Sequence, residues 1–235
     1  EKGWWNSIEA SDLNNDGRMD FIIGNEGLNS AYKASPEKPI KMHFDDFDNN
    51  GAVDPIISYY IKEKSYPLAT RDELLSQWVA LKSIYPSYES YANTDLKTLL
   101  NEHLTEETQK WEATQMKSII LLSTEDGYEA LELPDEVQRS PLKSIIPIDL
   151  NEDGNQDLIL AGNRSKNALK IGQNEANYGI VLLGDGKGSF EYIPPLKSGL
   201  KIRGSVSTMV EIDKKLYIGL CAESLSIYKR NYNED

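Results

Sequence analysis

The sequence predicts a mainly β fold with one helical insertion. Three aspartate-rich loops each lead directly into a short apolar run, such as the segment 158–162 that follows Asp157. These runs are about five residues long, are rich in β-branched side chains and end in Gly-Asn or a pair of tyrosines, which is typical of buried strands. Residues 70–115 break the pattern with leucines and tryptophans at helical spacing. We therefore expect repeated loop-and-strand units on both sides of a helical segment.

The N-terminal part contains two such units. Residues 3–30 hold an apolar approach, the first loop and a strand, and a second unit runs from Pro39 through the second loop to Ile61. Thr70-Arg-Asp-Glu73 has the pattern of a capping box, which predicts the start of a helix. Helical spacing continues through residues 105–111, so we expect a helical insertion at about 70–115.

The β pattern resumes after the insertion. We expect the hairpin at 117–133 to complete the second unit, and a third unit to run from Pro141 through the third loop to a hairpin that turns at 184–188. Residues 164–177 within it are polar and predict a loop. The last unit, 200–228, has no aspartate loop, because lysines occupy the positions after Asp213. The polar segment 230–235 is expected to end the pattern.

The three loops share the spacing of a cation site with oxygen ligands. Positions 1, 3, 5 and 9 carry carboxylates or amides, glycine stands at position 6 where the backbone must turn, and position 7 can add its backbone carbonyl. Three carboxylates in an all-oxygen cage favour Ca²⁺ over Mg²⁺, so we expect up to three calcium ions. The predicted ligands are Asp12, Asn14, Asp16, Arg18 and Asp20; Asp46, Asp48, Asn50, Ala52 and Asp54; and Asp149, Asn151, Asp153, Asn155 and Asp157.

Ordinary turns and EF-hands share features with these loops. Asn, Asp and Gly are also the residues that ordinary turns prefer, so any single copy could be a polar turn without a metal. The recurrence of the acidic position 9 in all three copies favours the cage. An EF-hand needs Glu at position 12, where this chain has Ile23, Ile57 and Leu160.

Composition excludes several functional classes. The chain has 235 residues and a net charge of −13, which argues against binding to a nucleic-acid backbone. The single cysteine, Cys221, lies in an apolar run and is expected to be a buried, inert thiol. His43 and His103 stand in no recognisable catalytic or zinc-binding pattern. We find no signal peptide or membrane span, and the start within a motif suggests a piece of a longer protein.

The aspartate loops that open apolar strands resemble the FG-GAP/VCBS repeats of integrin-α-like β-propellers. The whole pattern is similar to the cartilage-acidic-protein-like VCBS-repeat proteins of Bacteroidetes. This resemblance covers nearly the whole chain and implies a single partial β-propeller over 1–235, with about four blades or part-blades. The other segments that carry it are 24–30, 65–69 with 71–74, 87–92, 133–134 and 184–188.

The resemblance implies a non-catalytic calcium-binding module that binds a protein or glycan, or acts as a scaffold, at the cell surface, outside the cell or in the periplasm. An open propeller would also expose apolar faces, which favours self-association. The alternative is a carbohydrate-active enzyme or its accessory domain, which would need free acids away from the loops. The best candidates for a ligand platform are exposed tyrosines, namely Tyr59, Tyr60, Tyr85, Tyr88 and Tyr91.

Overall fold

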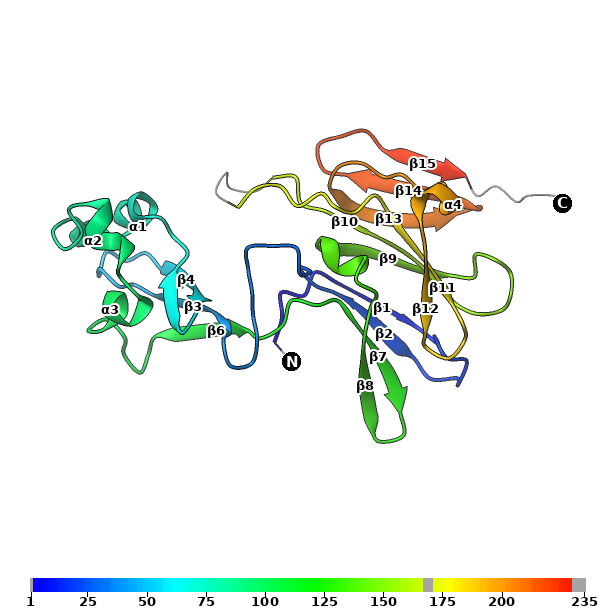
Figure 1. Cartoon of the computed structure of the whole chain (residues 1–235), viewed down its shortest axis with the longest axis horizontal. Coiled ribbons are helices and arrows are strands. Elements are labelled where there is room, and N and C mark those ends of the chain that lie inside the picture. Colours follow the sequence, from blue (N-terminus) through cyan, green and yellow to red (C-terminus); the bar gives the residue numbers. More distant parts are fainter. Residues whose placement is uncertain (1, 167–170, 230–235) are drawn as a thin grey trace. The chain divides into compact units, whose positions relative to one another are not determined.

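The computed structural model describes residues 2–166 and 171–229 and has a mainly β architecture (Figure 1). Part of the predicted loop at 164–177 and the segment 230–235 lie outside the described residues. The strands are β1 Ser7–Ser11, β2 Asp20–Gly24, β3 Ile40–Asp45, β4 Asp54–Ile61, β5 Lys64–Pro67, β6 Gln109–Ala113, β7 Ile119–Thr124, β8 Gly127–Glu132, β9 Leu142–Ile148, β10 Asp157–Gly162, β11 Ile180–Gly184, β12 Phe190–Ile193, β13 Val206–Ile212, β14 Lys215–Leu220 and β15 Ser226–Lys229. The helices are α1 Arg71–Gln77, η1 Val79–Lys82, α2 Tyr88–Ala92, α3 Leu96–Leu100, η2 Val137–Arg139 and α4 Pro195–Ser198.

The chain divides into two compact units. The smaller unit comprises the residues up to Gly3 together with Tyr32–Gln115, and the larger unit comprises Trp4–Ala31 and the residues from Met116 onward. The chain therefore enters the larger unit, leaves it to form the smaller one, and returns.

The smaller unit contains one antiparallel sheet, which we name the inserted sheet, in the order β5-β4-β3-β6. Helices α1, α2 and α3 pack beside it around Trp78, which is 2% exposed and stacks on Phe47 with ring centroids 5.5 Å apart. Helix α1 begins at the predicted capping box, where the Thr70 side chain accepts from the backbone of Glu73 and the Glu73 carboxylate accepts from the backbone of Thr70. Helices α1–α3 thus lie within the segment where a helical insertion is predicted.

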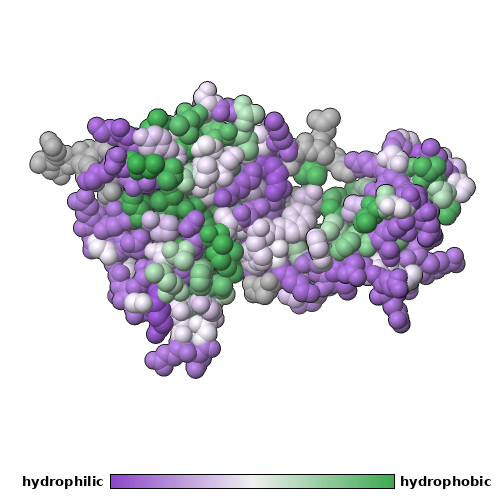
Figure 2. Space-filling view, turned by 180° about the vertical axis from the view of Figure 1, so that it is seen from behind, coloured by the Kyte–Doolittle hydropathy of each residue, from purple (hydrophilic) through white to green (hydrophobic). Residues whose placement is uncertain are grey.

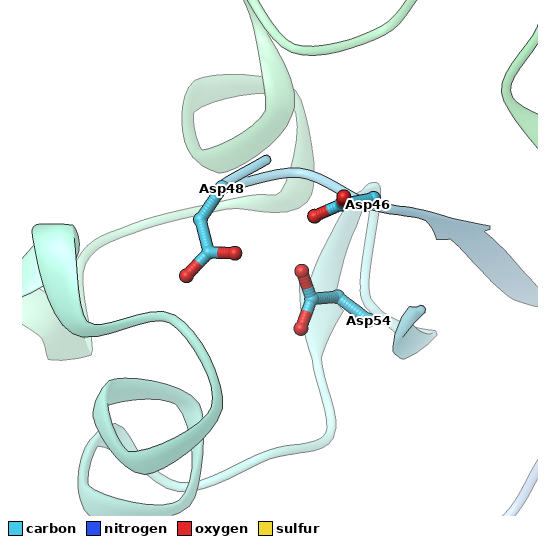
Figure 3. Close-up of side chains that lie close together, drawn as sticks. All are labelled: Asp46, Asp48 and Asp54. Carbon is cyan, nitrogen blue, oxygen red and sulfur yellow. The ribbon is translucent and has the colours of Figure 1, made fainter. Parts of the chain in front are cut away.

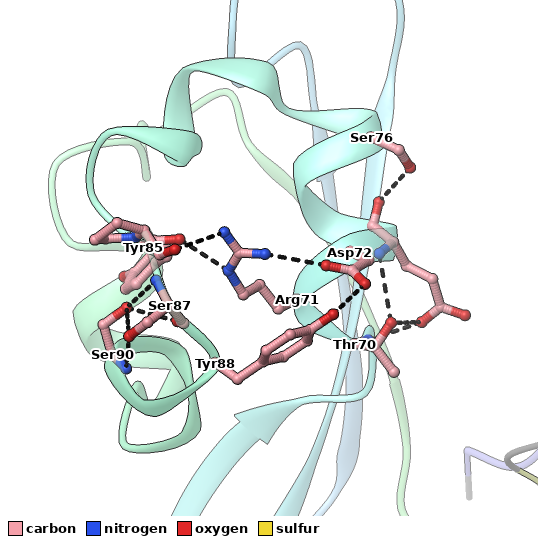
Figure 4. A network of polar contacts seen from close by, with 10 residues as sticks. Thr70, Arg71, Asp72, Ser76, Tyr85, Ser87, Tyr88 and Ser90 are labelled. Carbon is pink, nitrogen blue, oxygen red and sulfur yellow. Dashed lines mark hydrogen bonds and ion pairs between the residues drawn. The ribbon is translucent and has the colours of Figure 1, made fainter.

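Hydrogen bonds between α1 and the following turn hold the helices in place (Figure 4). The Arg71 guanidinium donates to the Tyr85 carbonyl at 2.9 Å and the Pro86 carbonyl at 3.2 Å. The Tyr88 hydroxyl donates to Asp72 at 2.6 Å. Because these bonds satisfy backbone carbonyls that no helix uses, the short α2 has a fixed position beside α1.

The prediction of helix at 105–111 is wrong. Residues 109–113 form β6, which pairs with β3 so that Trp111 lies opposite Met42. Without β6, β3 would present an unpaired edge, and Trp111 gains an edge-to-face contact with Phe44 at 4.9 Å. Tertiary pairing therefore overrides the helical spacing in this segment.

The larger unit contains three antiparallel sheets. The first sheet has the order β1-β2-β7-β8, the second sheet β9-β10-β11-β12 and the third sheet β13-β14-β15. Strand β9 contacts β1 of the first sheet and β13 of the third, so the three sheets follow one another through their first strands. Two apolar clusters fill the spaces between them, one around Leu158 and Leu182 and one around Ile159 and Ile218.

The hairpin at 117–133 does not complete the second predicted unit. Its strands are β7 and β8, and β7 pairs with β2 of the first sheet, with Ile120 opposite Ile22. Both side chains are at most 1% exposed. The reason is burial, because this pairing places two isoleucines in the core beside the second sheet.

Membrane-spanning helices are not found in the described part of the chain, where no helix is long and apolar enough to cross a bilayer.

Candidate metal sites in the aspartate loops

All three loops turn in the same way. The carboxylate at position 1 accepts the backbone N–H of position 5 at 2.9–3.2 Å and that of the glycine at position 6 at 2.8–2.9 Å. The glycines have φ of +84 to +87°, a region that side chains disfavour. The three carboxylates at position 1 are those of Asp12, Asp46 and Asp149.

The aspartate at position 9 is buried in every loop and fastens the loop to its strand. Asp20, Asp54 and Asp157 are 0%, 2% and 0% exposed. One oxygen of each accepts the backbone N–H of position 2, at 2.8, 3.1 and 2.8 Å respectively. Since a buried carboxylate is stable only with such partners, these aspartates hold the two ends of each loop together.

The partner of the second carboxylate oxygen at position 9 differs between the second loop and the other two loops. In the first loop Asp20 accepts from the backbone of Ser123 at 2.7 Å, and in the third Asp157 accepts from Gly184 at 2.8 Å. Both donors lie at or next to the last residue of the third strand of the same sheet, β7 and β11 respectively. In the second loop the side-chain amide of Gln77, at the end of α1, lies near this carboxylate, but its buried nitrogen has no hydrogen-bond partner.

The second loop brings three carboxylates together. Asp46, Asp48 and Asp54 each offer an oxygen that lies within 4.8 Å of the other two (Figure 3). Within 2–166 and 171–229, this is the one group of three or more acidic, histidine or cysteine side chains with that spacing. One oxygen of Asp48 is buried and has no hydrogen-bond partner. A cation coordinated by these oxygens would satisfy it.

The electrostatics of this group favour an added positive charge. Burial raises the pKa of Asp54, and the nearby carboxylates of Asp48 and Asp46 act in the same direction. The Gln77 amide and the Phe47 N–H oppose the shift but do not overcome it. Like charges this close disfavour full ionisation, and a bound divalent ion would remove the repulsion.

The first and third loops do not gather three carboxylates in the same way. Their position 5 residues, Asp16 and Asp153, turn toward the backbone N–H of position 7 at 2.8 Å. These hydrogen bonds lower the pKa of both carboxyl groups. Position 3 is asparagine in both loops, and its amide donates to the position 5 carboxylate at 3.0 and 2.9 Å. The predicted ligands are thus close in sequence but partly engaged with one another.

Position 7 also differs among the loops. The Arg18 guanidinium contacts the Asp16 carboxylate at 2.7 Å, so a fixed cation already lies beside the first loop. In the third loop Asn155 accepts from the side chain of Asn15 at 2.9 Å, which places the first and third loops side by side. The N–H groups of Arg18, Ala52 and Asn155 each bind the position 5 side chain. The prediction that their carbonyls are ligands stays a prediction.

The sequence reasoning missed a polar cluster in the larger unit. Arg164 donates to both oxygens of Glu26 at 2.8 and 2.7 Å, and the Glu26 side chain is 3% exposed. Burial raises the pKa of Glu26, although Arg164 and Lys143 act against the shift. The signal was present in the repeats, because Glu26 and Arg164 both follow a Gly-Asn pair at the end of a strand.

Cys221 is exposed, so the prediction of a buried thiol is wrong. It follows the last residue of β14 and begins the turn toward β15, so its side chain lies outside the sheet core. Its sulfur lies 2.9 Å from the Ser207 hydroxyl, and this hydrogen bond lowers the pKa of the thiol, with a smaller contribution from Lys143.

Two of the five tyrosines that were predicted to form an exposed ligand platform pack into the core of the smaller unit instead. Tyr85 is 6% exposed and packs edge-to-face against Tyr91, with ring centroids 5.6 Å apart. The Tyr91 hydroxyl donates to the Ala69 carbonyl at 2.7 Å, so both rings belong to the core of the smaller unit. Tyr88 is 66% exposed, while Tyr59 and Tyr60 are half-buried on β4.

Comparison with protein-family models finds no match, and comparison with curated proteins finds no significant match. The resemblance to FG-GAP/VCBS repeats therefore stays a prediction, and a functional proposal has to rest on the residues themselves.

Proposed function

We propose that this chain is a calcium-binding module of β-propeller type that binds a protein or a glycan, or acts as a scaffold, at the cell surface or in the periplasm, without catalysing a reaction. The observation that carries the proposal is the group of Asp46, Asp48 and Asp54, with oxygens within 4.8 Å of one another in a loop that occurs three times.

The sheets of the larger unit support the propeller part of the proposal. Each is antiparallel, and β9 contacts the first strand of the sheets before and after it. Propeller blades are small antiparallel sheets of this kind, repeated side by side. Two of the aspartate loops join the first and second strands of their sheets, at 12–20 and 149–157. The repetition favours one architectural unit used several times.

The ligand chemistry supports calcium. The loops offer carboxylate and amide oxygens, with a glycine turn at position 6, and Ca²⁺ takes six to eight such oxygens at about 2.3–2.6 Å. Each loop has three carboxylates, but only those of the second loop, at positions 1, 3 and 9, lie within reach of one ion. In the first and third loops the third carboxylate is at position 5 and is turned toward a backbone N–H, so the second loop should bind most tightly. It also lacks the Arg18 cation of the first loop. Metal there would fix the end of β3, the start of β4 and the neighbouring α1.

A binding role is favoured over catalysis because the loop acids are already engaged. The carboxylates at positions 1 and 9 accept backbone N–H groups in every loop. A general acid must instead reach a substrate to hold and release a proton, and carboxylates that are hydrogen-bonded within their own loop are not free to do so.

The experiment is calcium titration by calorimetry, with thermal unfolding in calcium, in magnesium and in EDTA. We expect calcium to raise the melting temperature and magnesium to have little effect. A site that is filled at a hundredfold excess over its Kd adds about 2.7 kcal/mol to the free energy of unfolding. If calcium does not bind and EDTA leaves unfolding unchanged, the loops are ordinary turns and the proposal fails.

A matched pair of variants assigns the strongest site. Asp48→Asn gives the second loop the position 3 residue of the other two loops, and Asn151→Asp gives the third loop the residue of the second. We expect the first variant to weaken the tightest calcium site by about tenfold or more, and the second to strengthen a weaker one, since affinity follows the number of charged ligands. Equal affinities in both variants and the original chain would contradict the assignment.

A further inference from the structure

In the part of the chain that the structure describes, the third sheet has one strand fewer than each of the other three sheets. The first and second sheets and the inserted sheet have four strands each, whereas the third sheet has β13, β14 and β15 among the residues that the structure describes. Because β13 contacts β9 as β9 contacts β1, strands β13, β14 and β15 correspond to β9, β10 and β11. The place that corresponds to β12 lies beyond the outer edge of β15.

Residues that lie opposite one another on successive strands form a row across each sheet, and these rows indicate how a fourth strand would pack. In the second sheet, Leu158 lies opposite Leu182, which lies opposite Tyr192 on the fourth strand, and Leu182 is 0% exposed. In the third sheet, the corresponding row runs from Leu216 to Tyr228 and has no further member within residues 2–166 and 171–229. Tyr228 remains half-buried. A residue on a fourth strand would lie opposite Tyr228, as Tyr192 of β12 lies opposite Leu182 in the second sheet.

An apolar groove lies between the second and third sheets. Its volume is about 780 Å³, and its lining includes Leu183 and Ile193 of the outer strands β11 and β12, Leu216, Tyr228, and Leu196 of α4. Leu196 is 101% exposed. Figure 2 shows hydrophobic side chains at the surface of the larger unit, on the side where the third sheet and α4 lie. Such an uncovered apolar region marks an interaction site.

The charge around the groove differs in sign from the rest of the chain. Lys197, Lys214 and Lys229 line it together with Glu152 and Glu211, whereas the whole chain carries −13. An acidic partner would therefore be attracted to this place and repelled by most of the remaining surface.

The chain's own outer strands indicate the chemistry of such a partner. Strand β12, Phe-Glu-Tyr-Ile, and strand β8, Gly-Tyr-Glu-Ala-Leu-Glu, both place glutamates between aromatic or aliphatic residues. In the second sheet, Phe190 and Tyr192 pack against the core while Glu191 stays exposed. A segment with this alternation would place apolar side chains in the groove and glutamates near Lys197 and Lys229.

We propose that the third sheet binds an extended acidic-apolar peptide segment of a partner protein, which adds to the edge of β15 as a fourth strand and covers the groove. Backbone hydrogen bonds to β15 supply affinity, and alternate side chains that enter the groove supply selectivity. This specifies the binding surface of the module proposed above, but it does not require metal in the loops.

The test is binding of a fluorescein-labelled peptide that copies residues 188–194, Gly-Ser-Phe-Glu-Tyr-Ile-Pro, followed by fluorescence anisotropy in calcium and in EDTA. Two further peptides carry N-methyl groups at one or the other set of alternate residues. In strand addition, one set of N–H groups faces β15 and the other faces away. We expect one methylated peptide to lose binding and the other to retain it.

Substitutions of exposed residues test the location of the site without destabilising the fold. Leu196→Glu and the double variant Lys197→Glu/Lys229→Glu should each weaken binding about five- to tenfold, through lost apolar contact and reversed charge. The matched controls are Leu104→Glu and Lys82→Glu in the smaller unit, where both residues are exposed. These controls should bind the peptide as the original chain does.

Three results would overturn the proposal. They are absence of peptide binding, equal loss with both methylated peptides, and concentration-dependent dimers in sedimentation that the groove variants abolish. The last would identify a second copy of the chain as the occupant. Calcium binding is measured separately, so failure of the peptide with intact calcium binding removes this inference and leaves the metal proposal standing.

Discussion

The buried aspartate at position 9 contributes to stability through two backbone hydrogen bonds. In the third loop Asp157 accepts from Leu150 and Gly184, both at 2.8 Å. Because these two bonds join the start of the loop and the end of β11 to the buried carboxylate, it is a structural group even before any metal binds.

Asp157→Asn should therefore destabilise the protein strongly. The amide can offer only one oxygen, and its NH₂ group would meet a backbone N–H, so we expect a loss of about 2–4 kcal/mol in the free energy of unfolding. Urea unfolding in EDTA measures this without a contribution from metal. The control is Asp153→Asn, since the second loop already has asparagine at position 5 and Asp153 is exposed, so its effect should be much smaller. Similar losses in the two variants would contradict this role of Asp157.

Glu26 gives a prediction of pH dependence. Its pKa is raised in the folded protein by burial, against the pull of Arg164 and Lys143. The folded state therefore binds a proton at a pH where the unfolded state has lost it. This contribution to stability is fully present below the unfolded pKa of 4.5 and is lost as the pH rises through the folded pKa.

Comparing the original chain with Glu26→Gln tests whether the Glu26 contribution to stability falls as the pH rises. Glutamine does not titrate, so the stability of the original chain relative to the variant should fall as the pH rises from about 4 through the folded pKa. Urea unfolding of both proteins over this range measures the difference. If that relative stability rises instead, the ion pair with Arg164 outweighs burial and the pKa is lowered.

At the scale of elements, glycine permits close contact between the second strand of a sheet and the preceding strand. A Cβ atom at Gly162, the last residue of β10, would lie 1.6 Å from the Pro141 carbonyl oxygen. The register of β10 against β9 shifts at this point, between Ala161 and Gly162. The backbones approach so closely here that no side chain fits.

Gly162→Ala should therefore disturb the packing of β10 on β9 and cost more than about 3 kcal/mol. Thermal unfolding measures the loss. Gly199→Ala is the control, because Gly199 has open space around it and only a φ of +71° to oppose the substitution, which costs about 1–2 kcal/mol. A smaller loss at Gly162 than at Gly199 would show that the backbone relaxes there.

Local features of the elements were predictable from sequence, but their pairing was not. The loops, the strands that follow them and the capping box at Thr70 were all visible in residue spacing. The apolar run 119–122 fits beside either β2 or β4 equally well by hydrophobicity, and only burial against the second sheet decides for β2. The grouping of Asp46, Asp48 and Asp54 follows the predicted spacing of the second loop. The turning of Asp16 and Asp153 toward backbone N–H groups could not be predicted, because it depends on three-dimensional geometry.

At the scale of the whole molecule, the smaller unit is an insertion into the first sheet. It leaves after β2 and returns before β7, which pair directly. The N–H of Gly27 donates to the carbonyl of Met116 at 2.8 Å, so the departing and returning segments lie together in the larger unit.

The larger unit should therefore fold without residues 32–115. Replacing them with a short Gly-Ser linker is expected to leave a cooperative thermal transition and the far-ultraviolet circular dichroism of a β protein. The calcium binding assigned to the second loop should be lost with the deleted residues. A non-cooperative transition would show that the larger unit depends on the inserted one.

The insertion also sets an order of events during folding. Strands β1 and β2 are synthesised first, but the partner of β2 emerges only after the whole smaller unit. Closing so long a loop in a disordered chain is slow and costs entropy, whereas a smaller unit that has already folded presents its two ends as a short connection. Until then the apolar strand β2 has an open edge, which makes the nascent chain prone to aggregation. Early folding of the inserted unit would therefore shorten the time during which β2 is exposed.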